Sequence, residues 1–208
     1  MMRLFDFLFP PRTDETVLRR ISDDGFSALM APRLTAATRP GTIALLSFGD
    51  ARVRAAVHEA KYHGTARALD LLARTLADYL RDSDEQARNI AIVPIPLGRI
   101  RMHERGFNQA EEVVRRALLA LDREGAHPFS LELGMLLRTR ETASQVSLPR
   151  REREENMCGA FSAAHPADPA RTYIVLDDVV TTGATLQAAI DALHASGAEH
   201  IVPLALAH

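Results

Sequence analysis

The residues best placed to do chemistry lie in the stretch 173–186. An apolar run suited to a buried strand ends in two adjacent carboxylates, Asp177 and Asp178, and a helical spacing of apolar residues begins at Leu186 after a short loop. A strand, a tight loop and a helix N-terminus together suit a phosphate group, because free backbone N–H groups point outward and the helix dipole favours an anion. We therefore predict a phosphate-binding loop, made of Thr181, Thr182, Gly183, Ala184 and Thr185.

The two carboxylates restrict the ligand further. They would repel a bare phosphate, but each can accept hydrogen bonds from the hydroxyls of a sugar, and the pair can help to hold a metal-bound ligand. Gly183 would let the backbone approach that ligand closely. The alternative is an ordinary turn, in which a threonine caps the helix and the aspartates only form the turn.

A second candidate anion site follows the expected strand 89–94. The loop 96–107 is basic and precedes a helix that is expected to run to about residue 123, with Asn108 and Glu111 as a capping box. Guanidinium groups near a helix N-terminus suit a diphosphate, whereas the alternative is a solvated surface loop. The loop residues proposed for this role are Leu97, Arg99, Arg101, Arg105 and Gly106.

The polar stretch 138–156 has no clear periodicity at its start. Loops of this length in compact domains tend to be functional or disordered, so we predict a lid that excludes water from the site. The alternative is a solvated, partly helical segment. The proposed lid residues are Arg138, Arg140, Gln145, Arg150, Arg151 and Arg153.

The remaining pattern predicts an α/β fold. Residues 1 to about 40 read as irregular, with a helical piece at 16–21. Strands alternate with helices, and this alternation favours a mostly parallel sheet with helices on both faces. Gly197 is expected to stop the helix that follows the threonine loop. Ligands in such folds bind at the carboxyl ends of the strands. Two helices are expected at 51–60 and 65–80, with a break between them at 61–64. Strands are expected at 42–48, 89–94, 131–137 and 201–206.

Composition limits the class of protein. The chain has 208 residues, a formal net charge of −2 and one cysteine, so no whole-protein basic field argues for nucleic acid and an intramolecular disulfide is excluded. The apolar run 4–9 contains Asp6 and is too short for a signal segment, and no stretch reaches transmembrane length. We expect a cytoplasmic protein with no membrane partner. The eight histidines and single cysteine form no cluster at metal-ligand spacing, so no zinc is expected.

Taken together, these motifs resemble a known family. The stretch 173–186 resembles the phosphoribosyl-pyrophosphate (PRPP) signature of type I phosphoribosyltransferases, and the chain as a whole resembles the ComF/GntX group of proteins with that fold. The further landmarks, in chain order, are Leu8-Phe9-Pro10-Pro11-Arg12, Ala60-Lys61-Tyr62-His63-Gly64, Val93-Pro94-Ile95-Pro96-Leu97, Arg105-Gly106-Phe107-Asn108-Gln109-Ala110, Leu137-Arg138-Thr139-Arg140 with Gln145, and 156–161.

The resemblance implies a type I phosphoribosyltransferase fold with a small N-terminal hood. It divides the chain into an N-terminal extension, 1–41, and a phosphoribosyltransferase-like domain, 42–208. Members of the group carry zinc-binding cysteines after the first landmark, but Thr13 stands where the first cysteine would be and residues 1–42 contain none. The extension is therefore expected to be a degenerate zinc module.

The resemblance also implies roles for the site residues. Asp177 and Asp178 would hold the ribose hydroxyls together with PRPP-bound Mg²⁺, the threonine loop would hold the 5′-phosphate, and the 96–107 loop would hold pyrophosphate. Lys61, the only lysine, and Tyr62 would face the acceptor, although a lone lysine is more often a neutral surface residue.

Two functions follow from these roles. The first is a Mg²⁺-dependent glycosyltransferase that moves a phosphoribosyl group from PRPP to a nucleobase or amine and releases pyrophosphate. The alternative is a non-enzymatic protein that senses PRPP or a nucleotide, or assists DNA uptake. DNA binding would be weak, and the chain could form a homodimer.

Overall fold

A computed structural model of the chain describes residues 12–83, 89–140, 157 and 159–208. Its centre is a six-stranded sheet of order β1-β2-β8-β7-β3-β4, in which β1 is antiparallel to β2 and the other neighbours are parallel. A separate antiparallel pair is formed by β5 and β6. The strand bounds are β1 Arg33–Thr35, β2 Thr42–Leu46, β3 Ile90–Pro94, β4 Phe129–Leu131, β5 Leu136–Arg138, β6 Phe161–Ala163, β7 Thr172–Val179 and β8 His200–Ala207.

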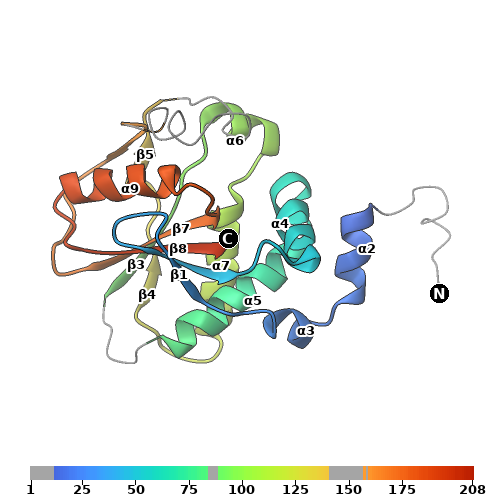
Figure 1. Cartoon of the computed structure of the whole chain (residues 1–208). Coiled ribbons are helices and arrows are strands. Elements are labelled where there is room, and N and C mark those ends of the chain that lie inside the picture. The colour runs from blue at the N-terminus through green and yellow to red at the C-terminus, as the bar shows by residue number, and fades with distance from the viewer. Residues whose placement is uncertain (1–11, 84–88, 141–156, 158) are drawn as a thin grey trace.

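Helices cover both faces of the central sheet, and Figure 1 shows α9 on one side of the strands and α5 on the other. The described helices are α2 Thr13–Arg20, α3 Asp23–Ser27, α4 Ala51–His63, α5 Ala66–Asp82, α6 Arg99–Arg105, α7 Gln109–Asp122 and α9 Ala184–Ala195. The predicted α/β class, with a mostly parallel central sheet flanked by helices, is therefore confirmed.

Two apolar clusters explain why the sheet is covered on both sides. Side chains alternate along a strand, so in β3 Ile90 and Ile92 pack in one cluster while Ala91 and Val93 pack in the other. The first cluster is completed by α4, α5 and α7, and the second by α9 and the β5–β6 pair. Strands buried on both faces read as near-continuous apolar runs, which is why 173–176 was recognisable.

Two helix predictions need correction. The break expected at 61–64 starts later, because α4 continues to His63 and is capped by Gly64, whose φ of 58° is a left-handed conformation that glycine adopts readily. The expected basic loop at 99–105 is the short helix α6, which ends at Gly106 in the same way, with φ of 76°.

The expected strand 131–137 is also wrong as a single element. It is split between β4, which ends at Leu131, and β5, which begins at Leu136 in the other sheet. Gly134 lies between them with φ of 79°, a conformation that turns the chain and that a continuous strand cannot contain. The apolar character of the segment was right, but the turn at its centre was missed.

The strand order fixes where a ligand can bind. From β7 the chain crosses through α9 to β8 on one side, whereas from β3 it crosses through α7 to β4 on the other side. The connections therefore diverge between β7 and β3. In open α/β sheets, such a switch point leaves a crevice outside the carboxyl ends of the two strands. The acidic end of β7 and the loop before α6 both lie at this edge.

Candidate functional site

The two carboxylates close strand β7 and leave it on different faces. Alternation along the strand directs the Asp178 side chain to the face covered by α4 and α7, and that of Asp177 to the opposite face. Asp178 is buried, with 5% of its surface exposed, whereas Asp177 is half-buried. A diol held by both groups would have to lie over the end of the strand rather than on either face.

Asp178 is surrounded by donors from three elements. Its Oδ2 lies 3.1 Å from Lys61 Nζ on α4 and accepts a hydrogen bond of 2.7 Å from Gln109 Nε2 at the start of α7. Its Oδ1 accepts a 2.7 Å bond from the Val179 backbone N–H. Burial alone would raise the pKa of Asp178, but the charge of Lys61 and these hydrogen bonds outweigh burial and lower it. Asp178 is therefore held as a carboxylate.

Asp177 has a different environment. Its Oδ1 accepts a 2.8 Å hydrogen bond from the backbone N–H of Asp178. Burial and the neighbouring Asp178 carboxylate raise the pKa of Asp177 to about 7, against the smaller opposing effect of Lys61. Adjacent acids with pKa values pushed in opposite directions are typical of functional sites, although structural ion pairs also produce such shifts.

The threonine loop connects β7 to α9. The Val180 N–H bonds to Ala207 O, so the loop starts beside the end of β8, and Thr181 is exposed. The N-cap position of α9 is Gly183, with φ of 80°, and not a threonine as the ordinary-turn alternative required. Thr182 Oγ1 accepts a long hydrogen bond of 3.5 Å from Ala184 N.

Gly183 is required by a contact within the chain. A Cβ atom built on Gly183 would lie 2.2 Å from the carbonyl oxygen of Ala37, a distance that no real side chain tolerates. The Ala37 segment is fastened to α9 by Gln187, whose Oε1 accepts from Arg39 N at 2.8 Å and whose Nε2 donates to Arg39 O at 3.4 Å. The glycine was predicted to permit close approach of a ligand, and the structure places the backbone of residue 37 against it.

The three arginines of the predicted pyrophosphate segment differ in exposure. Arg99 is exposed and Arg101 is half-buried, both at the start of α6. Arg105, in the last turn, lies over the ring of Tyr62 with 5.4 Å between its Cζ and the ring centroid, and its Nη1 donates to Gln109 Oε1 at 2.9 Å. Burial lowers the pKa of Arg105, partly offset by the Asp178 charge, although the guanidinium stays protonated at neutral pH.

The other two members of that segment lie on either side of α6. Leu97 is half-buried in the turn before the helix, and Gly106 ends it. The structure thus joins four predicted site residues in one cluster. Gln109 bonds to Arg105 and Asp178, and these two contact Tyr62 and Lys61 respectively. Sequence reasoning gave them three separate roles: Lys61 and Tyr62 faced the acceptor, Arg105 the pyrophosphate and Asp178 the ribose.

Two functional candidates were missed by sequence reasoning. Asn108 is buried, and its Nδ2 donates to Ile95 O at 2.9 Å while its Oδ1 caps α7 by accepting from Ala110 N at 3.0 Å. The predicted reciprocal bond from Glu111 is replaced by a 2.8 Å ion pair with Arg115. Gln109 is buried beside it. The available signal was two consecutive amide side chains at an expected helix start, because such groups need specific partners when they are buried.

Two of the six predicted lid residues, Arg138 and Arg140, belong to the part of the chain that the structure describes. Gln145, Arg150, Arg151 and Arg153 lie outside the described residues. Arg138 ends β5, where its Cζ lies 5.4 Å from the Phe161 ring centroid. Arg140 is exposed just after that strand.

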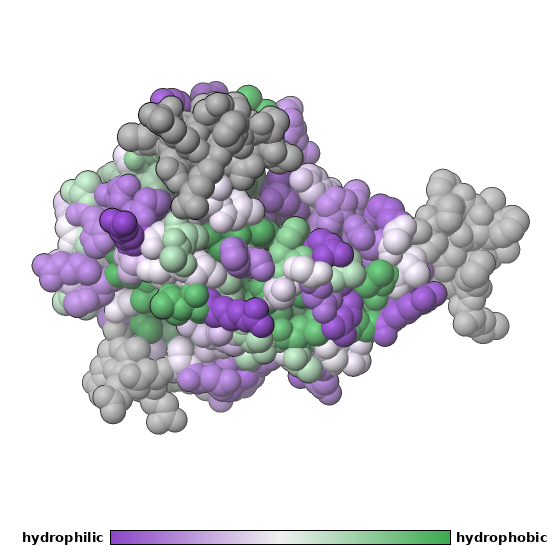
Figure 2. All heavy atoms as spheres, in the orientation of Figure 1, coloured by the Kyte–Doolittle hydropathy of each residue, from purple (hydrophilic) through white to green (hydrophobic). Residues whose placement is uncertain are grey.

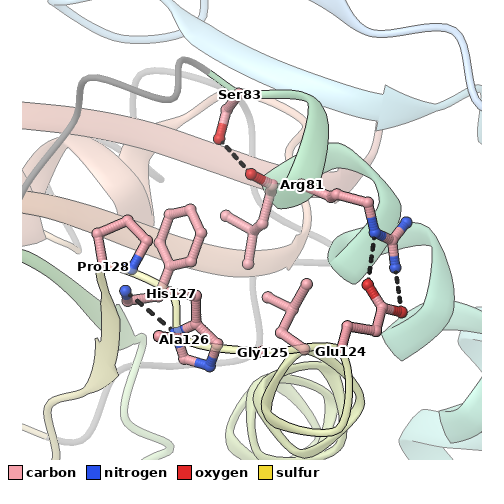
Figure 3. A pocket seen from close by; sticks show the side chains of 10 residues that line it. Arg81, Ser83, Glu124, Gly125, Ala126, His127 and Pro128 are labelled. Carbon is pink, nitrogen blue, oxygen red and sulfur yellow. Dashed lines mark hydrogen bonds and ion pairs between the residues drawn. The ribbon is translucent and has the colours of Figure 1, made fainter.

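A cavity elsewhere in the fold does not suit the predicted ligand. It has a volume of about 300 Å³ and is lined by the end of α5, the end of α7 and the start of β4, as Figure 3 shows. These elements meet at the amino ends of the strands, opposite the acidic end of β7. Its arginine, Arg81, is already bound to Glu124 through two hydrogen bonds and to Asp78 through a third. A phosphate would therefore find no available guanidinium there.

The surface of the described residues is mixed in character. On the face in Figure 2, hydrophilic and hydrophobic residues are interspersed. Within the described ranges, no group of three or more His, Cys, Asp or Glu side chains could hold a metal ion. No helix in that part of the chain has the length and apolar character needed to cross a membrane.

Comparisons with known proteins agree with the resemblance read from the motifs. The chain is 33% identical to competence protein F of Haemophilus influenzae over 113 residues, which is 53% of this chain and 47% of that protein. It is 34% identical to competence protein ComFC of Bacillus subtilis over 110 residues, 53% of this chain and 40% of that protein. It is 35% identical to the DNA utilization protein YhgH of Escherichia coli over 107 residues, 51% of this chain and 44% of that protein.

The chain is thus related to the ComF competence proteins. It spans about half the length of the relatives it matches. Among solved structures, adenine phosphoribosyltransferase from Leishmania tarentolae is similar with a TM-score of 0.35 and 15% identity, over 70% of this chain and 59% of that one. No protein-family model matches the chain.

Proposed function

We propose that this protein binds PRPP with Mg²⁺ at the end of β7 and transfers its phosphoribosyl group to a nitrogen acceptor. The observation that carries the proposal is the meeting of two acids, a glycine-capped threonine loop and a half-buried arginine at the switch point of the sheet. Acids suit a sugar diol, the loop suits a phosphate and the arginine suits a diphosphate.

Each group would have a defined task. Asp178, held as a carboxylate, would accept hydrogen bonds from ribose hydroxyls, and Asp177 would do so from the other side of the strand end. The backbone N–H groups at the start of α9, with Thr181, Thr182 and Thr185, would bind the 5′-phosphate. The α6 arginines would face the pyrophosphate, and the exposed Tyr62 ring would contact the acceptor.

The residues at the strand end also fit Mg²⁺, since carboxylate oxygens are the ligands that this ion takes from proteins. Bound with PRPP, the ion supplies positive charge that neutralises the leaving pyrophosphate. We expect this protein to bind no zinc.

The reaction would exchange one bond at the anomeric carbon for another. A bond forms from the acceptor nitrogen to that carbon, the bond from carbon to the pyrophosphate oxygen breaks, and pyrophosphate leaves with the electron pair. The nitrogen then loses its proton to water, since the cluster offers no side chain positioned as an obvious base. Charge develops on the ribose ring, and the adjacent carboxylates would stabilise it.

The experiment is a binding titration followed by a turnover screen. Calorimetry with PRPP and Mg²⁺ should give binding in the wild type and none in the double variant Asp177→Asn/Asp178→Asn, because an amide nitrogen donates where a carboxylate only accepts. Pyrophosphate release should then be screened against nucleobases and amines. Unchanged PRPP affinity in the double variant would contradict the site.

A second function is favoured by the names of the relatives. Competence protein F, ComFC and YhgH are named for competence or DNA utilization. The alternative is that this protein assists DNA handling without turnover. In that case no acceptor would support pyrophosphate release, and DNA affinity would fall steeply with salt, because contacts to phosphates release counterions.

A further inference from the structure

We propose that Gln109 is the positioning residue that links the pyrophosphate side of the site to the ribose side. Its Nε2 donates to Asp178 Oδ2 at 2.7 Å, and its Oε1 accepts from Arg105 Nη1 at 2.9 Å. One buried amide therefore joins the last turn of α6 to the end of β7. This inference rests on the proposed function.

The direction of the Gln109 amide is set by its two partners. A carboxylate can only accept hydrogen bonds and a guanidinium can only donate them. If the amide were turned over, its oxygen would face the Asp178 carboxylate and its NH₂ group would face Arg105. Both contacts would be lost, and a buried amide without partners is costly. Gln109 therefore presents its NH₂ group to Asp178 for as long as Arg105 stays in place.

The backbone at Gln109 is also fixed. Gln109 is the first residue of α7, directly after the cap residue Asn108. Asn108 ties this helix start to the loop after β3 through Ile95 O. Since β3 and β7 are neighbours, these consecutive amides connect the two strand ends that border the crevice.

The arrangement has a consequence for ligand binding. If a diphosphate draws Arg105 away, the Gln109 oxygen loses its partner, and the hold on Asp178 changes with it. Occupancy of the pyrophosphate side and the orientation of the ribose acid would then be coupled. Lys61 holds the same Asp178 oxygen from α4, so both neighbours of that oxygen come from outside β7.

The first test measures PRPP affinity in the presence of Mg²⁺ by calorimetry. Gln109→Leu keeps a similar volume but removes both hydrogen bonds, and affinity should fall on the order of 10-fold, as expected for a hydrogen bond to a charged group. Glu112→Gln is the matched control in the first turn of the same helix, where Glu112 only approaches Arg116 at 3.7 Å. The control should bind as the wild type does.

A double-mutant cycle separates positioning from general structural support. If Gln109 acts through Asp178, then Gln109→Leu/Asp178→Asn should bind PRPP no more weakly than Asp178→Asn alone. A merely structural role would give additive losses. Additive losses, or wild-type affinity in Gln109→Leu, would overturn the inference and leave the proposed function standing.

A measurement without ligand keeps the inference testable if PRPP does not bind. In NMR spectra of the wild-type protein, the side-chain NH₂ group of Gln109 should give a shifted and protected proton signal, which Asp178→Asn and Arg105→Met should both change. Absence of PRPP binding in the wild type would end the proposed function, and this signal would still decide whether Gln109 is held between the two groups. A solvent-like Gln109 signal would overturn the inference on its own.

Discussion

Lys61 Nζ lies 3.1 Å from Asp178 Oδ2, so the only lysine of the chain is the counter-ion of the buried acid at the end of β7. Lys61 belongs to the last turn of α4. The sequence interpretation gave Lys61 to the acceptor and Asp178 to the ribose. The structure places them in one ion pair, which attaches α4 to the sheet at the candidate site.

Removing Lys61 should destabilise the fold. In Lys61→Met, Asp178 keeps its burial but loses its cation, and we expect the free energy of unfolding to fall by about 1–3 kcal/mol. The effect stays below that of a fully buried pair, because 26% of the Lys61 side chain is exposed. Urea denaturation at neutral pH measures it.

Arg115→Met is the control for that measurement. Arg115 pairs with Glu111 on the solvent side of α7, with 48% of its side chain exposed. Its loss should cost no more than about 0.5 kcal/mol. Equal losses in the two variants would show that the Lys61–Asp178 pair has no special weight.

Gly183→Ala should be more damaging than an equivalent change elsewhere. Gly183 and Gly134 have nearly the same φ, 80° and 79°, but a Cβ would meet Ala37 O at 2.2 Å in the first case and nothing within 4 Å in the second. Gly134→Ala should therefore cost only the backbone strain, about 1–2 kcal/mol. Gly183→Ala should cost clearly more and should lower PRPP affinity, because the loop over residue 37 must shift. Urea midpoints of the two variants compare them directly, and equal midpoints would contradict the contact.

Much of the fold could be predicted from local patterns. The strand 173–176 and the helix after it were recognisable from apolar spacing that persists over several residues. The segment 99–105 was not recognisable as a helix, because it is rich in basic residues and carries no apolar stripe. The turn at Gly134 was missed for a related reason, since one glycine inside an apolar run does not reveal a change of sheet.

The contacts of the site could not be predicted in the same way. The acids and the threonine loop are adjacent in sequence, so their roles could be read together. The Gln109–Asp178 bond joins residues 69 positions apart, and it depends on which strands are neighbours. The requirement for glycine at position 183 could not be predicted either, because it arises from a contact with Ala37 in a distant segment.

Stability should fall as pH rises through the range in which Asp177 titrates. Its pKa is about 7 in the folded protein, above the ordinary value near 4, so the folded state holds a proton that the unfolded chain has released. Asp177→Asn should remove this dependence and be more stable than the wild type at pH 8, by about 1–3 kcal/mol for a half-buried group. Asp178, with a lowered pKa, should contribute stability at neutral pH that is lost only as the pH falls into the acidic range.

Urea denaturation at pH 5 and pH 8 tests that prediction. Asp70→Asn serves as the control, since 59% of the Asp70 side chain is exposed. The control should keep the pH dependence of the wild type. If Asp177→Asn keeps it as well, another group is responsible for the loss of stability.

Charge reversal at Arg105 should separate the two proposed functions. Arg105→Glu places a carboxylate where the pyrophosphate is expected, and also opposite the Gln109 oxygen that now accepts from the guanidinium. If the protein is a transferase, pyrophosphate release should be lost, while any DNA binding stays weak and changes little. Arg115→Glu makes the same charge change on the solvent side of α7 and should leave release intact.

The accessory function predicts another pattern for the same pair of variants. DNA affinity would then depend on the summed positive charge, so both reversals should weaken it by similar factors and reduce its salt dependence. Fluorescence anisotropy with a short single-stranded DNA at two salt concentrations measures this alongside pyrophosphate release. The transferase reading requires that Arg105→Glu and Arg115→Glu differ in turnover. Tight, salt-sensitive DNA binding in the wild type, with no PRPP affinity and no difference between the variants, would favour the accessory role instead.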